Sequence, residues 1–402
     1  MTAVERIPDR TRDAGRPQRL ALLYDPKVRG AVFQVVALAL VLALIYFAVV
    51  NAWTNLRAQG IASGFGFLDQ VAGFDISQTL IPYTNTSSYG RAFLVGLLNT
   101  LLVAAVGIVL ATVHGFVVGV MRLAKTWLLR QIAGAYIEVM RNIPLLVQLI
   151  FWYFAVIKQL PNPRQSIELP LGAVLNIRGL YLPALVFEPR AIVAGILLVA
   201  ALVGWFVLAR WARRRQMATG ERFPVFWTGL AAVLALPMLG LAATGFPFTV
   251  ETPELRGFNF VGGIVVGPEF AALLLGLTLY TAAFIAEIVR AGITAVSKGQ
   301  TEAAHALGLP SGLTLRLVVI PQAMRVIVPP LTNQYLNLTK NSSLAVAIGY
   351  PDLVSVFAGT VLNQTGQAVE AILITMGVYL SISLLTSMFM NWFNRRIALV
   401  ER

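Results

Sequence analysis

Long apolar runs recur along this 402-residue chain and most constrain what it can fold into. Each run spans about 18 residues or more, the length that a helix needs to cross the hydrocarbon core of a bilayer. Only 12% of the residues are charged, about half the share expected of a soluble domain. We therefore expect an all-α polytopic membrane protein rather than a soluble protein with a large core.

The apolar runs divide the chain into about eight expected transmembrane helices. Pro144 lies in the third run, which we expect to begin at the membrane interface and to bend there. The seventh run contains Pro329, Pro330 and Lys340, so it can cross only if these residues face protein or water. The expected spans cover about residues 31–50, 93–120, 132–157, 191–209, 223–243, 269–289, 323–348 and 369–390.

The basic residues indicate the orientation of these spans. Of the 31 Lys and Arg residues, 22 lie in segments that this scheme places on one side, and 7 lie on the other. Because cytoplasmic segments are enriched in Lys and Arg, we expect both termini, 1–30 and 394–402, in the cytoplasm and the loop 51–92 outside. The net charge of +13 therefore indicates topology rather than nucleic-acid binding.

Several kinds of chemistry are excluded by missing residues. The chain has no cysteine, and His114 and His305 are its only histidines, so no metal site and no cofactor are expected. It also lacks a Gly-x-x-x-x-Gly-Lys-Ser/Thr sequence, which would cradle nucleotide phosphates. We therefore expect a chain that is not an enzyme, with no catalytic residue, and any ATP hydrolysis must come from a partner.

The stretch 299–321, GQTEAAHALGLPSGLTLRLVVIP, is expected in the cytoplasm between two spans. Gly308 stands where a glycine ends a helix, and Pro310 blocks its continuation. Ser311 is expected to cap a second short helix, which Pro321 ends. The alanine-rich face beside Glu302 suits close docking in a groove of another protein, although an ordinary connecting loop would have similar features.

Specific motifs identify a family. Glu302-Ala303-Ala304, followed by Gly308 and by Val318-Val319-Ile320-Pro321, resembles the EAA motif of ABC importer permeases. The usual end of the motif is Ile-x-Leu-Pro, so Val-Val-Ile-Pro is a mild departure. The flanking residues are similar to polar amino-acid permeases of this family: residues 283–293 (AFIAEIVRAGI), 96–101 (GLLNTL), 141–148 (RNIPLLVQ), 329–333 (PPLTN) and 338–344 (LTKNSSL).

The resemblance implies a type I ABC importer transmembrane fold over 93–393, with the coupling loop at 290–322. Segment 158–268 has no counterpart in typical five-span members, so it implies a two-helix insertion with two external loops, 158–190 and 244–268. This long form is similar to the larger permease subunits of general L-amino acid importers and of glutamate/glutamine/aspartate/asparagine systems. In such permeases the residues at Glu302, Ala303, Ala304 and Gly308 contact the ATPase.

The resemblance also implies partners and a location. Such a permease lies in the bacterial inner membrane, in contact with lipid, and works with a cytoplasmic ATPase dimer, a second related permease and a periplasmic amino-acid-binding protein. The external loops could help to dock the binding protein, or they could be ordinary connections. The expected function is that of a permease subunit of an ATP-driven importer for L-amino acids, which forms the translocation path.

Polar residues near the spans are candidates for the translocation path. Lys340 is the sharpest candidate, since a buried ammonium is costly and could meet a substrate carboxylate. It could equally be a helix-end lysine that snorkels, and the hydroxyl and amide groups could serve only as interhelical hydrogen bonds. The candidates are Asn99, Thr100, Tyr280, Thr281, Asn337, Lys340, Asn341 and Ser342.

The alternative class is an ion-coupled secondary amino-acid transporter, which requires a carboxylate near the middle of the membrane. The acidic candidates fall near span ends or in loops: Glu138, Glu287, Asp352 and Glu370. Glu138 and Arg141 are three residues apart and are expected to pair on one helix face. His114 is expected to be packed and hydrogen-bonded inside a span rather than to relay protons, and His305 to be a contact or surface residue rather than a pH sensor.

Overall fold

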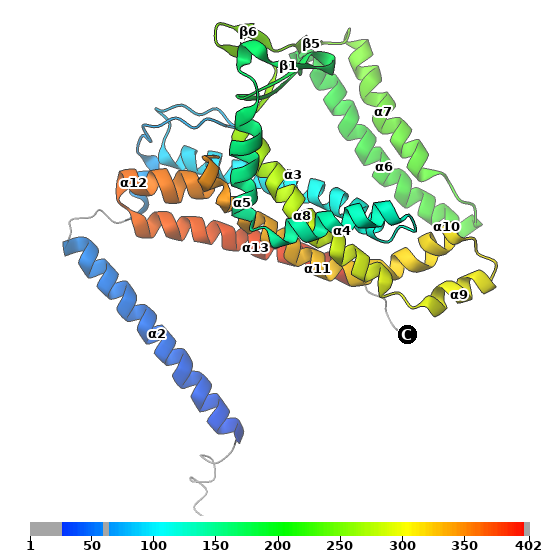
Figure 1. Ribbon diagram of the computed structural model, residues 1–402, viewed down its shortest axis with the longest axis horizontal. Coiled ribbons are helices and arrows are strands. Elements are labelled where there is room, and N and C mark those ends of the chain that lie inside the picture. The colour runs from blue at the N-terminus through cyan, green and yellow to red at the C-terminus, as the bar shows by residue number, and fades with distance from the viewer. Residues whose placement is uncertain (1–25, 59–63, 398–402) are drawn as a thin grey trace, which may run out of the picture.

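The structure is a computed structural model that describes residues 26–58 and 64–397, most of them helical (Figure 1). Within these residues, seven helices are long and apolar enough to cross a membrane, and one bent pair makes an eighth candidate span. This confirms the prediction of an all-α polytopic membrane protein with about eight transmembrane helices. Most of the expected basic tail, residues 1–25, and residues 398–402 of the C-terminus lie outside the described residues.

The helices lie close to the expected positions. The longer ones are α2 (Pro26–Ala58), α3 (Tyr89–Arg122), α4 (Trp127–Asn142), α5 (Leu145–Ile150), α6 (Ile192–Thr219), α7 (Val225–Ala243), α8 (Pro268–Thr294), α9 (Lys298–Ala306), α11 (Ile320–Asn341) and α13 (Ala368–Ile397). Short helical segments join them: η1 (Phe65–Asp69), η2 (Phe151–Val156), η3 (Ile157–Gln159), η4 (Pro163–Gln165), η5 (Pro170–Gly172), η6 (Pro189–Ala191), α10 (Ser311–Thr314), η7 (Leu315–Val319), η8 (Ser342–Ile348), η9 (Val354–Val361) and α12 (Leu362–Thr365).

The third span bends at Pro144, as predicted. Helix α4 and the segment that begins with α5 meet at 105°. Gln148 holds the bend, since its Nε2 donates to the backbone oxygens of Met140 and Ile143, each at 2.9 Å. These carbonyl groups lie at the end of α4, where a helix leaves acceptors without internal partners. One buried amide side chain therefore satisfies the backbone at the break.

Helices α3 and α8 form the centre of the molecule because small residues let them approach closely. A Cβ atom at Gly115 would lie 2.6 Å from Cβ of Ile285, and one at Gly119 would lie 2.8 Å from Cβ of Val289. Close approach through small residues is the usual way in which helices associate in a membrane. Helix α11 packs on the same pair, with Ile327 against Gly292 of α8.

Helix α11 corrects the prediction for the seventh span. Pro321 does not end the second short helix: α10, the π-helical turn η7 and α11 follow one another directly, and Ser311–Ile348 forms one continuous candidate span. A π-helical turn shifts the backbone hydrogen-bond pattern, and here it precedes the proline that lacks an N–H. Pro329 and Pro330 likewise lie inside α11 instead of interrupting it.

The loops expected at 158–190 and 244–268 contain strands, which the sequence analysis did not predict. Strands β1, β2, β3 and β8 form an antiparallel sheet in that order, while β4 pairs with β5 and β6 with β7. Gly262 and Gly263 lie between β7 and β8 and have positive φ angles of 87° and 74°. The strands are β1 (Ile167–Leu169), β2 (Ala173–Asn176), β3 (Gly179–Leu182), β4 (Ala184–Phe187), β5 (Phe248–Glu251), β6 (Glu254–Arg256), β7 (Asn259–Val261) and β8 (Ile264–Val266).

The strands gather at one end of the molecule, and the helices α6 and α7 lead away from them as an antiparallel hairpin (Figure 1). Only 11% of the most apolar stretch of each hairpin helix is buried, compared with 56% for α8. Helix α2 also stands apart from the body, and none of its most apolar stretch is buried. The body, by contrast, is a continuous packed core around α3 and α8.

Candidate functional site

The expected helical pair between two spans is present. Helix α9 ends before Gly308, whose φ of +77° is the left-handed conformation that a helix-ending glycine adopts. Ser311 does not cap the next helix as predicted: it is the first residue of α10, and the cap position is Pro310. The pair lies at the end of the body opposite the strands (Figure 1).

The EAA residues divide between two faces of α9. Glu302, Ala303 and Gly308 are exposed, and Leu307 exposes 82% of its surface. Ala304 is instead 4% exposed and faces its own chain. Its small side chain lets α9 lie close to the next turn, where the backbone N–H of Leu309 donates to the oxygen of Ala304 at 3.1 Å. The exposed surface therefore combines a carboxylate, a methyl group and an apolar tip.

Polar contacts fix this helical pair to itself and to α11. His305 is exposed, and its Nδ1 lies 3.0 Å from the backbone oxygen of Leu309 across the turn. Gln322 in the first turn of α11 donates to Gln300 of α9 at 3.3 Å. Because α10 runs directly into α11, movement of the pair would be transmitted along that helix.

Four of the path candidates are buried: Asn99, Thr100, Thr281 and Ser342. Asn99 Nδ2 donates to the backbone oxygen of Pro351 at 2.9 Å, and Thr100 Oγ1 accepts from the backbone N–H of Leu353 at 3.0 Å. These bonds tie α3 to the connection before η9. For Asn99 and Thr100, this is the interhelical role that the sequence analysis left open.

The remaining path candidates are accessible or half-buried. Asn337 and Lys340 are exposed, and Asn341 and Tyr280 are half-buried. Asn333, which is also exposed, precedes Asn337 by four residues and Lys340 by seven, so the three side chains share one face of α11. This face is polar although it lies on a candidate membrane span.

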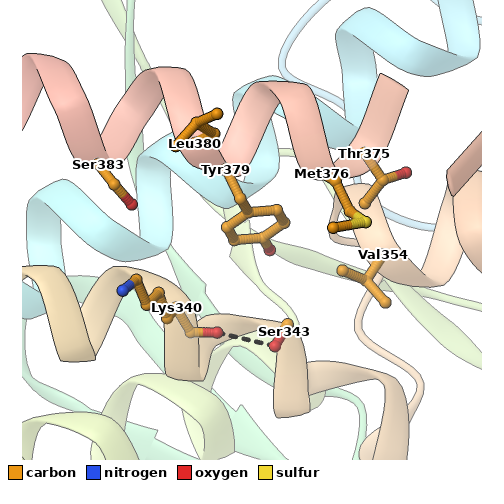
Figure 2. Close-up of a pocket in the computed structure, with 8 residues that line it drawn as sticks. All are labelled: Lys340, Ser343, Val354, Thr375, Met376, Tyr379, Leu380 and Ser383. Atoms are coloured by element: carbon orange, nitrogen blue, oxygen red, sulfur yellow. Dashed lines mark hydrogen bonds between the residues drawn. The ribbon is translucent and has the colours of Figure 1, made fainter. Parts of the chain in front are cut away.

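A pocket of about 440 Å³ opens beside Lys340 (Figure 2). Lys340 and Ser343 line one side, and Thr375, Tyr379 and Ser383 from α13 line the other. The three α13 residues are spaced by four, which places them on one helix face. The sequence analysis missed them, although this polar spacing within an apolar run was a usable signal. An ammonium, several hydroxyl groups and apolar atoms can together hold a small zwitterion.

Asp352 lies outside the lining of this pocket and contacts one of its lining residues, Tyr379. Its carboxylate accepts from the backbone N–H of Ser355 at 2.9 Å and from the hydroxyl of Tyr379 at 3.2 Å. Asp352 lies in the connection between two spans and is fully buried. Burial raises its pKa to about 6, because desolvation disfavours the charged form more than the hydrogen bonds favour it. The sequence analysis placed Asp352 in a loop and missed this role.

The prediction that Glu138 pairs with Arg141 was wrong. Among the described residues, Glu138 forms no ion pair with Arg141, because the Arg141 guanidinium lies over the ring of Phe284, 5.2 Å from its centre. The ion pair in this region joins Glu287 and Arg290 within α8.

The two histidines and the acidic residues form no further site among the described residues. His114 packs edge-on against Tyr136, with 5.3 Å between the ring centres, as expected, but its buried Nε2 has no hydrogen-bond partner, contrary to the prediction. In the described part of the chain, no group of three or more His, Asp or Glu side chains could hold a metal ion.

Comparisons with known proteins agree with the motifs. Residues 219–399 match the family described as "Binding-protein-dependent transport system inner membrane component". The general L-amino acid transport system permease protein AapQ of Rhizobium johnstonii is 52% identical over 94% of this chain and 95% of that protein. The putative amino-acid ABC transporter permease protein YhdX of Escherichia coli is 53% identical, over 94% and 96%.

A third relative shares the long form. The glutamate/glutamine/aspartate/asparagine transport system permease protein BztB of Rhodobacter capsulatus is 42% identical over 95% of this chain and 96% of that protein. Fold, motifs and relatives together define a multi-pass inner-membrane transport subunit, not an enzyme. The chain belongs to the permease family of binding-protein-dependent ABC importers, which excludes the ion-coupled transporter as its class and implies an ATPase among its partners.

Proposed function

We propose that this chain is the larger permease subunit of an ATP-driven importer of L-amino acids. The observation that carries the proposal is the exposed α9–α10 pair, which bears the EAA residues and continues directly into α11. The end-to-end similarity to AapQ and YhdX supports L-amino acids as the substrate class. The chain supplies the path, and a separate ATPase dimer supplies the energy.

The α9–α10 pair docks on the ATPase in this proposal. Glu302 offers a carboxylate to a basic or amide partner, and Ala303 and Gly308 allow close approach of backbone to backbone. Leu307, which is almost fully exposed, provides an apolar anchor, since burial of an exposed leucine side chain contributes about 1.5–3 kcal/mol. Ala304 acts from the inner side by keeping α9 against the following turn.

Movement of the ATPase reaches the path through α11. Helices α10 and α11, together with η7 and η8, form one continuous span from Ser311 to Ile348. Lys340 lies near the far end of this span and lines the pocket against α13. A displacement of the docked pair would therefore change the geometry between Lys340 and Tyr379 without bending a flexible loop.

The docking end is the cytoplasmic end in this proposal, with both chain termini on the same side. The clustering of Lys and Arg supports this orientation, because cytoplasmic flanks of spans are enriched in positive charge. Arg122, Arg290 and Arg395 all lie at span ends on that side. The β-strands then lie in the periplasm, where a binding protein for amino acids would dock on them.

The polar face of α11 faces a second, related permease in this proposal. Asn333, Asn337 and Lys340 are exposed in the single chain, and an ammonium that faces lipid is costly. A second subunit would enclose this face and create a water-accessible path. Lys340 is positioned to meet the carboxylate of a passing amino acid, while Asn99 and Thr100 support the path by fixing α3 to the connection before η9.

Reconstitution tests the proposal. Proteoliposomes that contain this chain, a second permease and an ATPase should accumulate radiolabelled L-amino acids only when ATP is inside and the binding protein is outside. Omission of the ATPase should abolish uptake. Uptake by this chain alone, driven by an ion gradient, would contradict the proposal and support a secondary transporter.

A further inference from the structure

The α6–α7 hairpin has no part in the proposed coupling or path, and its surface is apolar. The two helices bury small residues against each other: Ala194, Ala201 and Ala212 on α6 and Gly229 and Gly240 on α7. Most other side chains of the hairpin are exposed, and they include long aliphatic groups along both helices. In a membrane such a surface contacts lipid, since the fold brings little protein against it.

One end of the hairpin is strongly basic. Five arginines lie within 13 residues: Arg210, Arg213, Arg214, Arg215 and Arg222, all of them exposed. Glu221 is the one acidic residue between 192 and 243, and it pairs with Arg215 at 2.6 Å. Among the described residues, the other four arginines form no ion pair. The end therefore has four guanidinium groups whose charge is not balanced by a carboxylate.

The position of these arginines along the helix matches the level of lipid headgroups. The first 18 residues of α6 carry no charge, and they span about 27 Å, close to the hydrocarbon thickness of about 30 Å. Arg210, the next residue, lies over the ring of Phe206 at 4.2 Å, and Arg215 lies over Trp211 at 5.5 Å. Trp227 of α7, 69% exposed, adds another aromatic residue near this end. Aromatic residues of this kind mark the membrane interface.

We propose that the basic end of the α6–α7 hairpin binds the phosphate groups of anionic phospholipids in the cytoplasmic leaflet. The inference rests on the orientation given under the proposed function. Charge complementarity carries it, because guanidinium groups bind phosphate through two parallel hydrogen bonds. Basic clusters directly beside a membrane span attract anionic lipid. Arg213 and Arg214 form the centre of the site, and Arg222 follows in the connection between α6 and α7.

The test uses two adjacent arginine pairs that are closely matched. R213Q/R214Q removes the centre of the site at the end of α6. R395Q/R396Q is the control: these arginines are also exposed at the end of a span, and Arg396 lies over Trp392 much as Arg215 lies over Trp211. Native mass spectrometry of the purified permease–ATPase complex, titrated with phosphatidylglycerol or phosphatidylcholine, measures the affinity for each lipid.

We expect the wild-type complex to prefer phosphatidylglycerol, and R213Q/R214Q to lose about 10- to 30-fold of that affinity, since each charge contributes about fivefold. R395Q/R396Q should lose much less, because that span end has a pair of arginines and not the cluster of five that converges on one phosphate site at the hairpin. R213K/R214K should stay close to wild type because the charge remains. Millimolar inorganic phosphate should not displace the lipid. Displacement by phosphate, equal losses in the two Gln variants, or loss of the ATPase from R213Q/R214Q would each overturn the proposal.

Uptake driven by ATP in the same preparations keeps the two proposals separate. The α9–α10 pair couples to the ATPase whether or not lipid binds the hairpin. An R213Q/R214Q complex that loses its lipid and still transports therefore supports the lipid site and leaves the proposed function intact. A wild-type complex that binds phosphatidylglycerol but fails in ATP-driven uptake would contradict the proposed function alone.

Discussion

The α3–α8 pair and the α6–α7 pair use the same local device in different surroundings. In each pair, glycines let two helices approach to distances that a Cβ atom would not permit. The α3–α8 pair is then covered by α4, α5 and α11, whereas α6–α7 remains largely exposed. Close helix packing alone therefore says little about function. The elements around a pair decide whether it transmits movement or only contacts lipid.

The largest expected difference between the α3–α8 and α6–α7 pairs is in the yield of folded complex when a glycine between the two helices is replaced. A side chain at Gly115 would meet Cβ of Ile285 at 2.6 Å and the backbone oxygen of Ala282 at 2.9 Å, and neither atom can move aside. At Gly229 the neighbour is the ring of Trp205, which is half-buried and can turn toward lipid. We expect G115V to prevent recovery of a folded complex, and G229V to cost about 1 kcal/mol or less.

Size-exclusion chromatography and thermal unfolding of the two variants measure this contrast. Equal yields of folded complex from G115V and G229V would show that the body does not depend on the close α3–α8 contact.

The second-largest expected effect is a loss of uptake when the exposed surface of the α9–α10 pair is changed. E302A should lower ATP-driven uptake at least tenfold, because a hydrogen bond to a charged group contributes about 1.5–3 kcal/mol. The permease should still fold, since Glu302 is exposed. Co-purification of the ATPase, measured beside uptake, separates weak docking from poor coupling. K298A, an exposed change four residues earlier on α9, serves as the control, and E302A with unchanged uptake would contradict the assignment.

A smaller effect is expected in the pocket. K340A should raise the substrate concentration for half-maximal uptake about tenfold, since it removes a charged partner of the substrate carboxylate. K125A, which removes an exposed ammonium group between α3 and α4, should leave uptake kinetics unchanged. Kinetics in proteoliposomes with matched ATPase content measures both variants. Unchanged uptake by K340A would remove Lys340 from the path.

The smallest effect is a pH dependence of stability. The raised pKa of Asp352, about 6, means that the folded protein binds this proton more tightly than the unfolded chain. The contribution of Asp352 to stability is therefore greatest at low pH and is lost as the pH rises from about 4 through 6. D352N should flatten this part of the curve of unfolding temperature against pH.

The α6–α7 hairpin has no buried carboxyl group, because its one acidic residue, Glu221, is exposed. D75N, at an exposed position before α3, is the control and should keep the wild-type curve. A D352N curve that falls as steeply as the wild type would show that Asp352 does not titrate in this way.

The sequence predicted the spans well because apolar length is a local property. The bend at Pro144 and the glycine that ends α9 were also local signals, and both are present. The continuation of the helix through Pro321 was not predictable from a local signal, because a proline ends a helix unless a preceding π-helical turn accommodates it. The strands of the insertion were missed because they are only three or four residues long, and because two of their pairings, β3–β8 and β4–β5, join residues far apart in the chain.

Some residues of the candidate site were likewise predictable from the local sequence, and others were not. The EAA residues were found from a motif, but the inward position of Ala304 required the fold. Lys340 was found because a charge within an apolar run is conspicuous. Tyr379 and Asp352 were missed because their relation to Lys340 arises only when α11, α13 and the connection before η9 pack together.

The central claim is that the exposed α9–α10 pair docks on a separate ATPase. It can be tested directly with a cysteine at Leu307, because the chain has no other cysteine and this position is almost fully exposed. A short thiol-reactive photocrosslinker at L307C should join this chain to the ATPase, and the same reagent at exposed Met217, as M217C, should not. Crosslinking to the ATPase from M217C and none from L307C would contradict the account.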